Sequence, residues 1–206
     1  MAKNSPEAIP KDRLIVGISG ASGVVYGIRL LEALNDLGVE SHLVVSKAAQ
    51  QTIGQETTLS SKAVAAKADF AYAVGDIAAP IASGSFRTMG MIVAPCSVRS
   101  MSEISTGVTS TLLTRAADVV LKERRTLVLM VRETPLHLGH LRTLAALAEM
   151  GAVILPPVPA FYTAPRTLDD VVDHTIGRAL DFFGYDWIRA KRWGESPSRN
   201  ARTKKA

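Results

Sequence analysis

The sequence is poor in cysteine and aromatic residues, and it has no long hydrophobic run. Cys96 is its one cysteine, so no internal disulfide can form, which fits a reducing compartment. Phe, Trp and Tyr make up 5% of the 206 residues, too few for a platform that stacks single-stranded nucleic acid. No apolar run approaches the roughly 18 residues of a membrane-spanning helix, and residues 1–13 lack the apolar centre of a signal peptide. We therefore expect a cytoplasmic protein that binds neither membranes nor nucleic acids.

The net charge of +5 is concentrated at one end of the chain. Residues 187–206 hold seven Lys or Arg and one Glu, a net charge of +6, which leaves the other 186 residues at −1. Nucleic-acid binding is one interpretation of this segment, but its composition is more typical of a solvated, partly disordered tail. We expect an N-terminal extension at 1–12, one folded domain at 13–186 and a basic tail at 187–206.

Strand and helix patterns alternate along the folded part. Short runs rich in β-branched residues predict strands at 13–18, 39–45, 90–94, 126–131 and 152–155. Apolar residues at helical spacing predict helices at 22–37, 47–56, 60–68, 108–124, 136–150 and 167–183. The segment 70–85 is ambiguous. The alternation predicts an α/β domain with a doubly wound, mostly parallel sheet that is covered by helices on both faces.

In a doubly wound domain, ligands bind beyond the C-terminal ends of the strands. After the first strand, Gly17, Gly20 and Gly23 follow G-x-x-G-x-x-G spacing, which differs from the G-x-G-x-x-G of dinucleotide sites. Such a turn suits the close approach of a phosphate, or it is a tight turn without a ligand. The second strand leads to Ser46, where an NAD site would carry Asp or Glu, so FMN suits this position better. Ser46 serves equally well as a helix N-cap.

Two further strand ends carry polar residues. The segment PCSVRS contains Ser97, Arg99 and Ser100, whose hydroxyl and guanidinium groups suit a phosphate or a flavin edge. The segment VRET contains Arg132 and Glu133, which form either a plain ion pair or a functional pair facing a cleft.

Two other patterns favour ordinary structural explanations. His137 and His140 form H-x-x-H but have no evident Cys or carboxylate partner, so we expect no metal site. Arg115 and Lys122 are seven residues apart and therefore share one side of a helix, which by default is a solvated side.

Over about residues 13 to 184, the chain resembles the flavin prenyltransferases, long described as partner proteins of ubiquinone-pathway and phenolic-acid decarboxylases. The matching segments are RLIVGISGASG, PCSVRSMSEISTG, LLTRAADVVLKERR, LVLMVRETPLHLGHLRTL, GAVILPPVPAFY and TLDDVVDHTIGRALDFFG. The resemblance implies a flavodoxin-like, Rossmann-like domain that assembles into a homododecamer. It also implies a metal-independent transfer of a dimethylallyl group from dimethylallyl monophosphate to N5 and C6 of reduced FMN. The product, prenylated FMN, would serve a separate decarboxylase.

The resemblance also implies roles for individual residues. The residues expected to bind FMN are Gly20, Ala21, Ser22, Ser46, Ser97, Val98, Arg99, Ser100 and Arg132. The prenyl phosphate would be bound by Lys122, supplied by a neighbouring subunit, together with Tyr162 and Arg178. The expected catalytic residues are Ser22, Glu56 and Glu133, of which the two glutamates match positions implicated in proton handling. The family often has Lys-Thr or Gly-Thr in place of Arg99-Ser100, so we expect altered contacts there and no loss of FMN.

Two other functions stay open. One is an FMN-dependent oxidative decarboxylase of peptidyl cysteine or phosphopantothenoylcysteine, although the N-x-x-M-W-type substrate motif of that group is absent from this sequence. The other is a non-catalytic partner subunit, which would bind FMN without turning over a prenyl phosphate.

Overall fold

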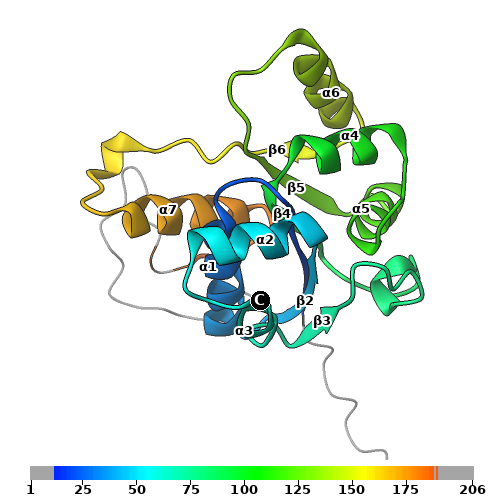
Figure 1. Cartoon of the computed structure of the whole chain (residues 1–206), viewed down its shortest axis with the longest axis horizontal. Helices are drawn as coiled ribbons and strands as arrows, with labels where there is room; N and C mark the ends of the chain where they lie inside the picture. Colours follow the sequence, from blue (N-terminus) through cyan, green and yellow to red (C-terminus); the bar gives the residue numbers. More distant parts are fainter. Residues whose placement is uncertain (1–11, 188, 190–206) are drawn as a thin grey trace, which may run out of the picture.

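Six parallel strands form one sheet in the computed structural model, which describes residues 12–187 and 189 (Figure 1). The strands are β1 (Arg13–Ile18), β2 (Glu40–Val45), β3 (Phe70–Tyr72), β4 (Gly90–Cys96), β5 (Thr126–Val131) and β6 (Val153–Ile154). Their order is β3-β2-β1-β4-β5-β6, and every neighbouring pair is parallel. This is the Rossmann order, and without the short edge strand β3 it is the flavodoxin order. The predicted doubly wound α/β fold is confirmed.

Helices cover both faces of this sheet. They are α1 (Val24–Leu37), α2 (Lys47–Glu56), α3 (Ser61–Ala65), α4 (Val98–Thr106), α5 (Leu112–Lys122), α6 (Leu138–Glu149) and α7 (Leu168–Asp181), with short 3-10 helices η1 (Pro80–Ala82) and η2 (Phe161–Thr163). One buried cluster joins α1 and α7 to the sheet, and a second joins α4 and α5 to its other face. In Figure 1, α6 and the segment that carries η2 extend away from the sheet in different directions.

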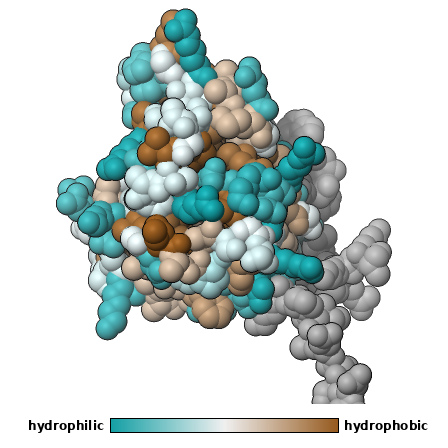
Figure 2. Space-filling model, turned by 90° about the vertical axis from the view of Figure 1, so that its right-hand side faces the viewer, coloured by the Kyte–Doolittle hydropathy of each residue, from teal (hydrophilic) through white to brown (hydrophobic). Residues whose placement is uncertain are grey.

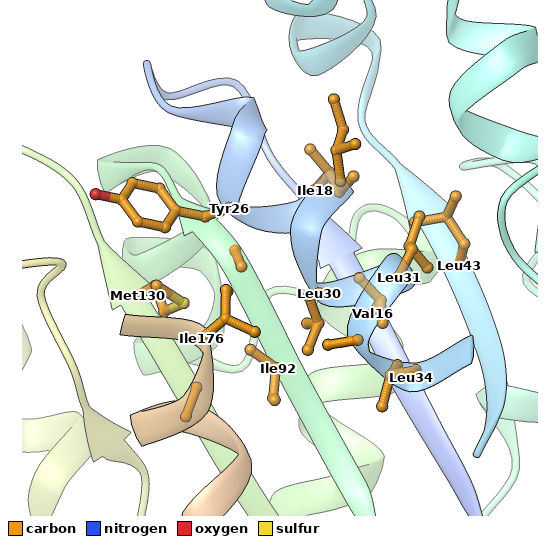
Figure 3. Packing of buried hydrophobic residues seen from close by; sticks show 14 of the residues in the cluster. Val16, Ile18, Tyr26, Leu30, Leu31, Leu34, Leu43, Ile92, Met130 and Ile176 are labelled. Carbon is orange, nitrogen blue, oxygen red and sulfur yellow. The ribbon is translucent and has the colours of Figure 1, made fainter. Parts of the chain in front are cut away.

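The core follows from alternation along the strands. Val16 of β1 and Ile92 of β4 face α1 and α7, where Leu30 and Ile176 pack against them (Figure 3). Ile15, the neighbour of Val16, faces the opposite cluster. Successive side chains of a strand point to opposite faces, so strands buried on both faces are apolar throughout. Each such buried side chain contributes about 1.5–3 kcal/mol to stability.

The structure corrects three element predictions. Helix α4 was not predicted, and the predicted helix 108–124 is shorter, because Gly107 ends α4 with φ 71° and Thr111 caps α5. Strand β4 continues through Pro95 to Cys96, because a register shift against β5 accommodates the proline, as at a bulge. The ambiguous segment 70–85 forms β3 and η1.

The last described residues pack on the domain. Trp187, the first residue of the predicted basic tail, is 1% exposed and donates from Nε1 to Asp36 at 3.3 Å. Residues 188 and 190–206, which make up the rest of that tail, lie outside the described residues, as does the predicted extension up to residue 11. Within the described ranges, every helix is too short or too polar to cross a membrane.

Candidate functional site

The turn between β1 and α1 is closely packed against α2. A Cβ atom on Gly20 would lie 2.3 Å from Cβ of Ala48, so a larger residue would force the turn and α2 apart. Gly23 is the N-cap of α1 with φ 98°, a conformation that glycine adopts without strain. Between them, Ala21 is half-buried and Ser22 is exposed. Two of the three glycines thus shape the turn, and Ser22 remains at its surface.

Glu56, the last residue of α2, caps the N-terminus of α1. Its Oε2 accepts hydrogen bonds from the backbone N–H groups of Gly23 at 2.8 Å and Val24 at 3.0 Å. The hydroxyl of Ser22 donates a further hydrogen bond to the same carboxylate. Helix α1 has no side-chain cap from its own N-cap residue, so this carboxylate satisfies two N–H groups at the positive end of the helix.

The surroundings of Glu56 favour its ionised form. Burial raises the pKa of Glu56, but hydrogen bonds from Ser22, Gly23 and Val24 and the charge of Arg132 outweigh this effect. The pKa therefore lies below the usual value of a glutamate. At neutral pH this group is a carboxylate, which can accept a proton and cannot donate one.

Arg132 joins this cluster from the end of β5. Its backbone N–H donates to the carbonyl of Cys96 at 3.1 Å, and its Cδ lies 3.5 Å from where a Cβ on Gly23 would be. Burial raises the pKa of the nearby Tyr26, and the charge of Arg132 opposes that rise. Ser22, Glu56 and Arg132 therefore meet at the C-terminal edge of the sheet, beside the point where strand order reverses between β1 and β4.

The expected serines sit at helix starts along the same edge. The hydroxyl of Ser46 accepts from Ala49 N–H at 3.1 Å and caps α2. The hydroxyl of Ser97 caps α4 and contacts that of Ser100, which is 8% exposed. Ser19, which sequence reasoning missed, is fully buried; its Oγ accepts from Ser97 N–H at 2.7 Å and donates to the Pro95 carbonyl at 2.9 Å. Its position directly after an apolar strand is the sequence feature that could have identified Ser19.

Three other expected residues, Val98, Arg99 and Glu133, lie at the same edge of the sheet but have other contacts. Val98 is half-buried against the α4–α5 cluster, and the 80% exposed side chain of Arg99 pairs with Glu103 at 2.8 Å. Glu133 is exposed and accepts a hydrogen bond from Thr134 N–H at 3.0 Å. In the part of the chain that the structure describes, Arg132 and Glu133 form no ion pair, so that sequence-based alternative is wrong.

Lys122 lies far from the cluster of Ser22, Glu56 and Arg132. It is the last residue of α5, four residues before β5 begins at Thr126, and therefore lies at the N-terminal edge of the sheet. It pairs with Glu123, and its Nζ would lie 2.9 Å from a Cβ on Gly84. Arg115 and Arg125 donate to carbonyls of the same loop, Ala82 and Gly84 among them. The loop at Ala82–Phe86 is thus surrounded by three cations.

Tyr162 and Arg178 lie along one side of α7. The hydroxyl of Tyr162, in η2, is 3.2 Å from Nε2 of His174. His174 and Arg178 are four residues apart and are neighbours on the helix surface. Arg178 is exposed and pairs with Asp181. His174 is a second residue that sequence reasoning missed, and nothing in the sequence pattern distinguishes it.

The histidine motif and the cysteine have structural explanations. Nδ1 of His137 accepts from Gly139 N–H at 3.0 Å and caps α6, and its ring stacks on that of His140 at 3.6 Å. Cys96 is fully buried, which raises its pKa to about 12 and leaves an unreactive thiol. Among the described residues, no three His, Cys, Asp or Glu side chains gather closely enough to hold a metal ion.

Comparison with known proteins identifies the family. Residues 2–180 match the Flavoprotein family. The flavin prenyltransferase UbiX of Escherichia coli strain K12 is 60% identical over 172 residues, which are 83% of this chain and 91% of that protein. The crystal structure of AnUbiX (PadA1) in complex with FMN and dimethylallyl pyrophosphate superposes with a TM-score of 0.89 at 46% identity, covering 91% of this chain and 100% of that one. A dodecameric FMN-dependent UbiX-like decarboxylase from Escherichia coli O157:H7 gives 0.87 at 51% identity, covering 89% and 100%. The chain belongs to the Flavoprotein family and, within it, to the flavin prenyltransferases.

Proposed function

We propose that this prenyltransferase joins the dimethylallyl group of dimethylallyl monophosphate to N5 and C6 of reduced FMN, and that the prenylated FMN serves a separate decarboxylase. The observation that carries the proposal is the cluster of Ser22, Glu56 and Arg132 at the C-terminal edge of the sheet. The high identity to a flavin prenyltransferase over most of the chain supports the same activity.

The chemistry of this edge fits FMN. It offers the hydroxyls of Ser22 and Ser46, the capped N-terminus of α4 at Ser97, and the guanidinium of Arg132. Hydroxyl and N–H donors near helix N-termini suit a phosphate, and a guanidinium suits a carbonyl edge or a phosphate. We propose that these residues, with the turn residues Gly20 and Ala21 and the α4 residues Val98, Arg99 and Ser100, hold FMN. The absence of an acidic residue at position 46 disfavours NAD.

Reduced FMN would supply two nucleophilic atoms: N5 would bond to C1 of the dimethylallyl group as the phosphate leaves and N5 loses its proton, and C6 would bond to C3 as C2 of the prenyl double bond gains a proton and C6 loses one. The Glu56 carboxylate holds the hydroxyl of Ser22 and can accept a proton through it. Glu133 is a second proton acceptor that the structure leaves exposed at the same strand end. The phosphate would be bound by the hydroxyl of Tyr162 and the charges of Arg178 and Lys122, which makes a metal ion unnecessary.

This assignment of Lys122 requires more than one copy of the chain. β5 is six residues long, or about 20 Å, and Lys122 and Ser22 lie at its opposite ends, so Lys122 reaches the site of another subunit. Leu138 and Leu141 of the projecting α6 are 60% and 50% exposed, an expected feature of a surface that is covered in an assembly. Figure 2 shows the face that lies on the right in Figure 1, where hydrophobic patches are interspersed with hydrophilic residues. We propose that the chain forms a homododecamer, because the similar UbiX-like decarboxylase from Escherichia coli O157:H7 is dodecameric.

One experiment separates this proposal from its alternatives. The protein is incubated anaerobically with reduced FMN and dimethylallyl monophosphate, and the released flavin is analysed by mass spectrometry. The proposal predicts a flavin heavier by one dimethylallyl group. Unchanged FMN that remains bound would favour the non-catalytic partner subunit. A parallel incubation of the protein and oxidised FMN with a cysteine-ended peptide tests the other alternative, since decarboxylation of that peptide would favour the oxidative decarboxylase. Tight binding of NAD without binding of FMN would contradict all three.

A further inference from the structure

We infer that His174 is a positioning residue that orients the hydroxyl of Tyr162 toward the prenyl phosphate. This inference rests on the proposed function and extends it to a residue of α7 for which the family resemblance gave no role.

The two side chains differ in how firmly they are held. His174 is 7% exposed, and it lines a small cavity together with Thr163 and Arg189. Tyr162 is 54% exposed, in a loop whose next residue back, Phe161, is 80% exposed. The hydroxyl of Tyr162 lies 3.2 Å from Nε2 of His174, and the two rings are nearly perpendicular, at 86° with centroids 5.8 Å apart. The buried His174 therefore contacts the exposed side chain of Tyr162 at its hydroxyl group.

The direction of this hydrogen bond follows from what the phosphate needs. A phosphate oxygen accepts hydrogen bonds, so the hydroxyl of Tyr162 must donate its one proton to it. The phenolic oxygen then accepts from Nε2–H of His174, which requires an imidazole with a proton on that nitrogen. A partner that can only accept would instead compete with the phosphate for the same proton. The side chain at position 174 must therefore be a hydrogen-bond donor.

Two further observations indicate that His174 acts through Tyr162. The cavity beside it, lined by Thr163, Asp170 and Arg189, has a volume of about 10 Å³, which is room for about one water molecule and too small for a prenyl phosphate. Arg178 follows His174 by four residues on the same side of α7, so a phosphate held by Arg178 is within the surroundings of Tyr162.

The test compares variants at position 174 with and without the tyrosine hydroxyl. In an enzyme that forms prenylated FMN, His174→Phe and His174→Met should each raise KM for dimethylallyl monophosphate about tenfold, the effect of one lost hydrogen bond to a charged group. The kcat and the affinity for FMN should stay within about threefold. His174→Gln, which keeps an N–H donor, should recover most of the lost affinity. In a Tyr162→Phe background, His174→Phe should have no further effect on KM.

Thr175→Val is the matched control, because Thr175 is also buried on α7 and its hydroxyl bonds only within the helix, to the Val171 carbonyl at 2.8 Å. It should leave KM unchanged. The inference is overturned if both position-174 variants keep the wild-type KM, if their effect persists in the Tyr162→Phe background, or if Thr175→Val reproduces it. A wild-type protein that forms no prenylated flavin would instead overturn the proposed function, and this inference with it.

Discussion

The two ends of the proposed site are built differently. The proposed flavin end is assembled within one chain, where Ser22 of the β1–α1 turn, Glu56 at the end of α2 and Arg132 directly after β5 meet at one edge of the sheet. The prenyl-phosphate end is divided, because Tyr162 and Arg178 lie along α7 while Lys122 lies at the opposite edge of the sheet from Ser22. Chain topology therefore suffices for the first end, and assembly is needed for the second.

The largest expected effect comes from the carboxylate at the flavin end. Glu56→Gln keeps the shape of the side chain but removes the charge and one acceptor for the N–H groups of Gly23 and Val24. Loss of a positioned proton acceptor lowers turnover by about a hundredfold or more. Steady-state kinetics of prenylated FMN formation measures this. Glu32→Gln is the control, because Glu32 also forms ion pairs, with Arg29 and Lys67, but lies outside the cluster of Ser22, Glu56 and Arg132. Equal turnover in both variants would exclude a catalytic role for Glu56.

Removal of the cation at the same end should weaken flavin binding. Arg132→Ala loses a charged hydrogen-bond donor, which costs roughly 1.5–3 kcal/mol, or about ten- to a hundredfold in affinity for FMN. Arg132→Lys keeps the charge and should give an intermediate affinity. Fluorescence titration with FMN checks both variants. An unchanged affinity of the alanine variant would place the flavin elsewhere.

At the prenyl-phosphate end, Arg178→Ala should raise KM for dimethylallyl monophosphate at least about tenfold, while the affinity for FMN stays within about threefold. Arg99→Ala is its control, because Arg99 is also exposed and pairs within its own helix, but at the flavin end. This control should leave the prenyl-phosphate KM unchanged. Simultaneous loss of both ligands in Arg178→Ala would show that the two ends are not separate.

The smallest expected effect is on acid stability. The folded pKa of Glu56 is below the 4.5 of an ordinary glutamate, so its contribution to folding is fully present above that pH and is lost as pH falls through the folded pKa. The thermal unfolding temperature of the wild type should therefore fall more steeply below pH 4.5 than that of Glu56→Gln. Parallel curves for the two proteins would contradict the charge–helix contact.

Sequence patterns predicted the fold well because the two-sided burial of β1, β4 and β5 imposes continuous apolar runs. They missed α4, because its polar start at Ser97 and Arg99 was interpreted only as a ligand-binding strand end, although Ser97 is also an N-cap. The strand ends predicted the edge of the sheet at which Ser46, Ser97 and Arg132 lie, directly after β2, β4 and β5. They could not predict that Glu56 caps α1 or that His174 contacts Tyr162, since both contacts join segments whose approach is set by helix packing.

The division of the site between subunits is the central claim, and mixed assemblies test it most directly. At concentrations of FMN and dimethylallyl monophosphate below the wild-type KM values, Arg132→Ala and Lys122→Ala should each keep about a tenth or less of the wild-type activity, one because flavin binding is weakened and the other because a phosphate contact is lost. Co-expressed in equal amounts, they should regain about a quarter of the wild-type activity, because some sites combine an intact flavin end with the neighbour's intact Lys122. Mixed assemblies that stay as inactive as the two parents would contradict the account, since both ends would then have to come from one chain.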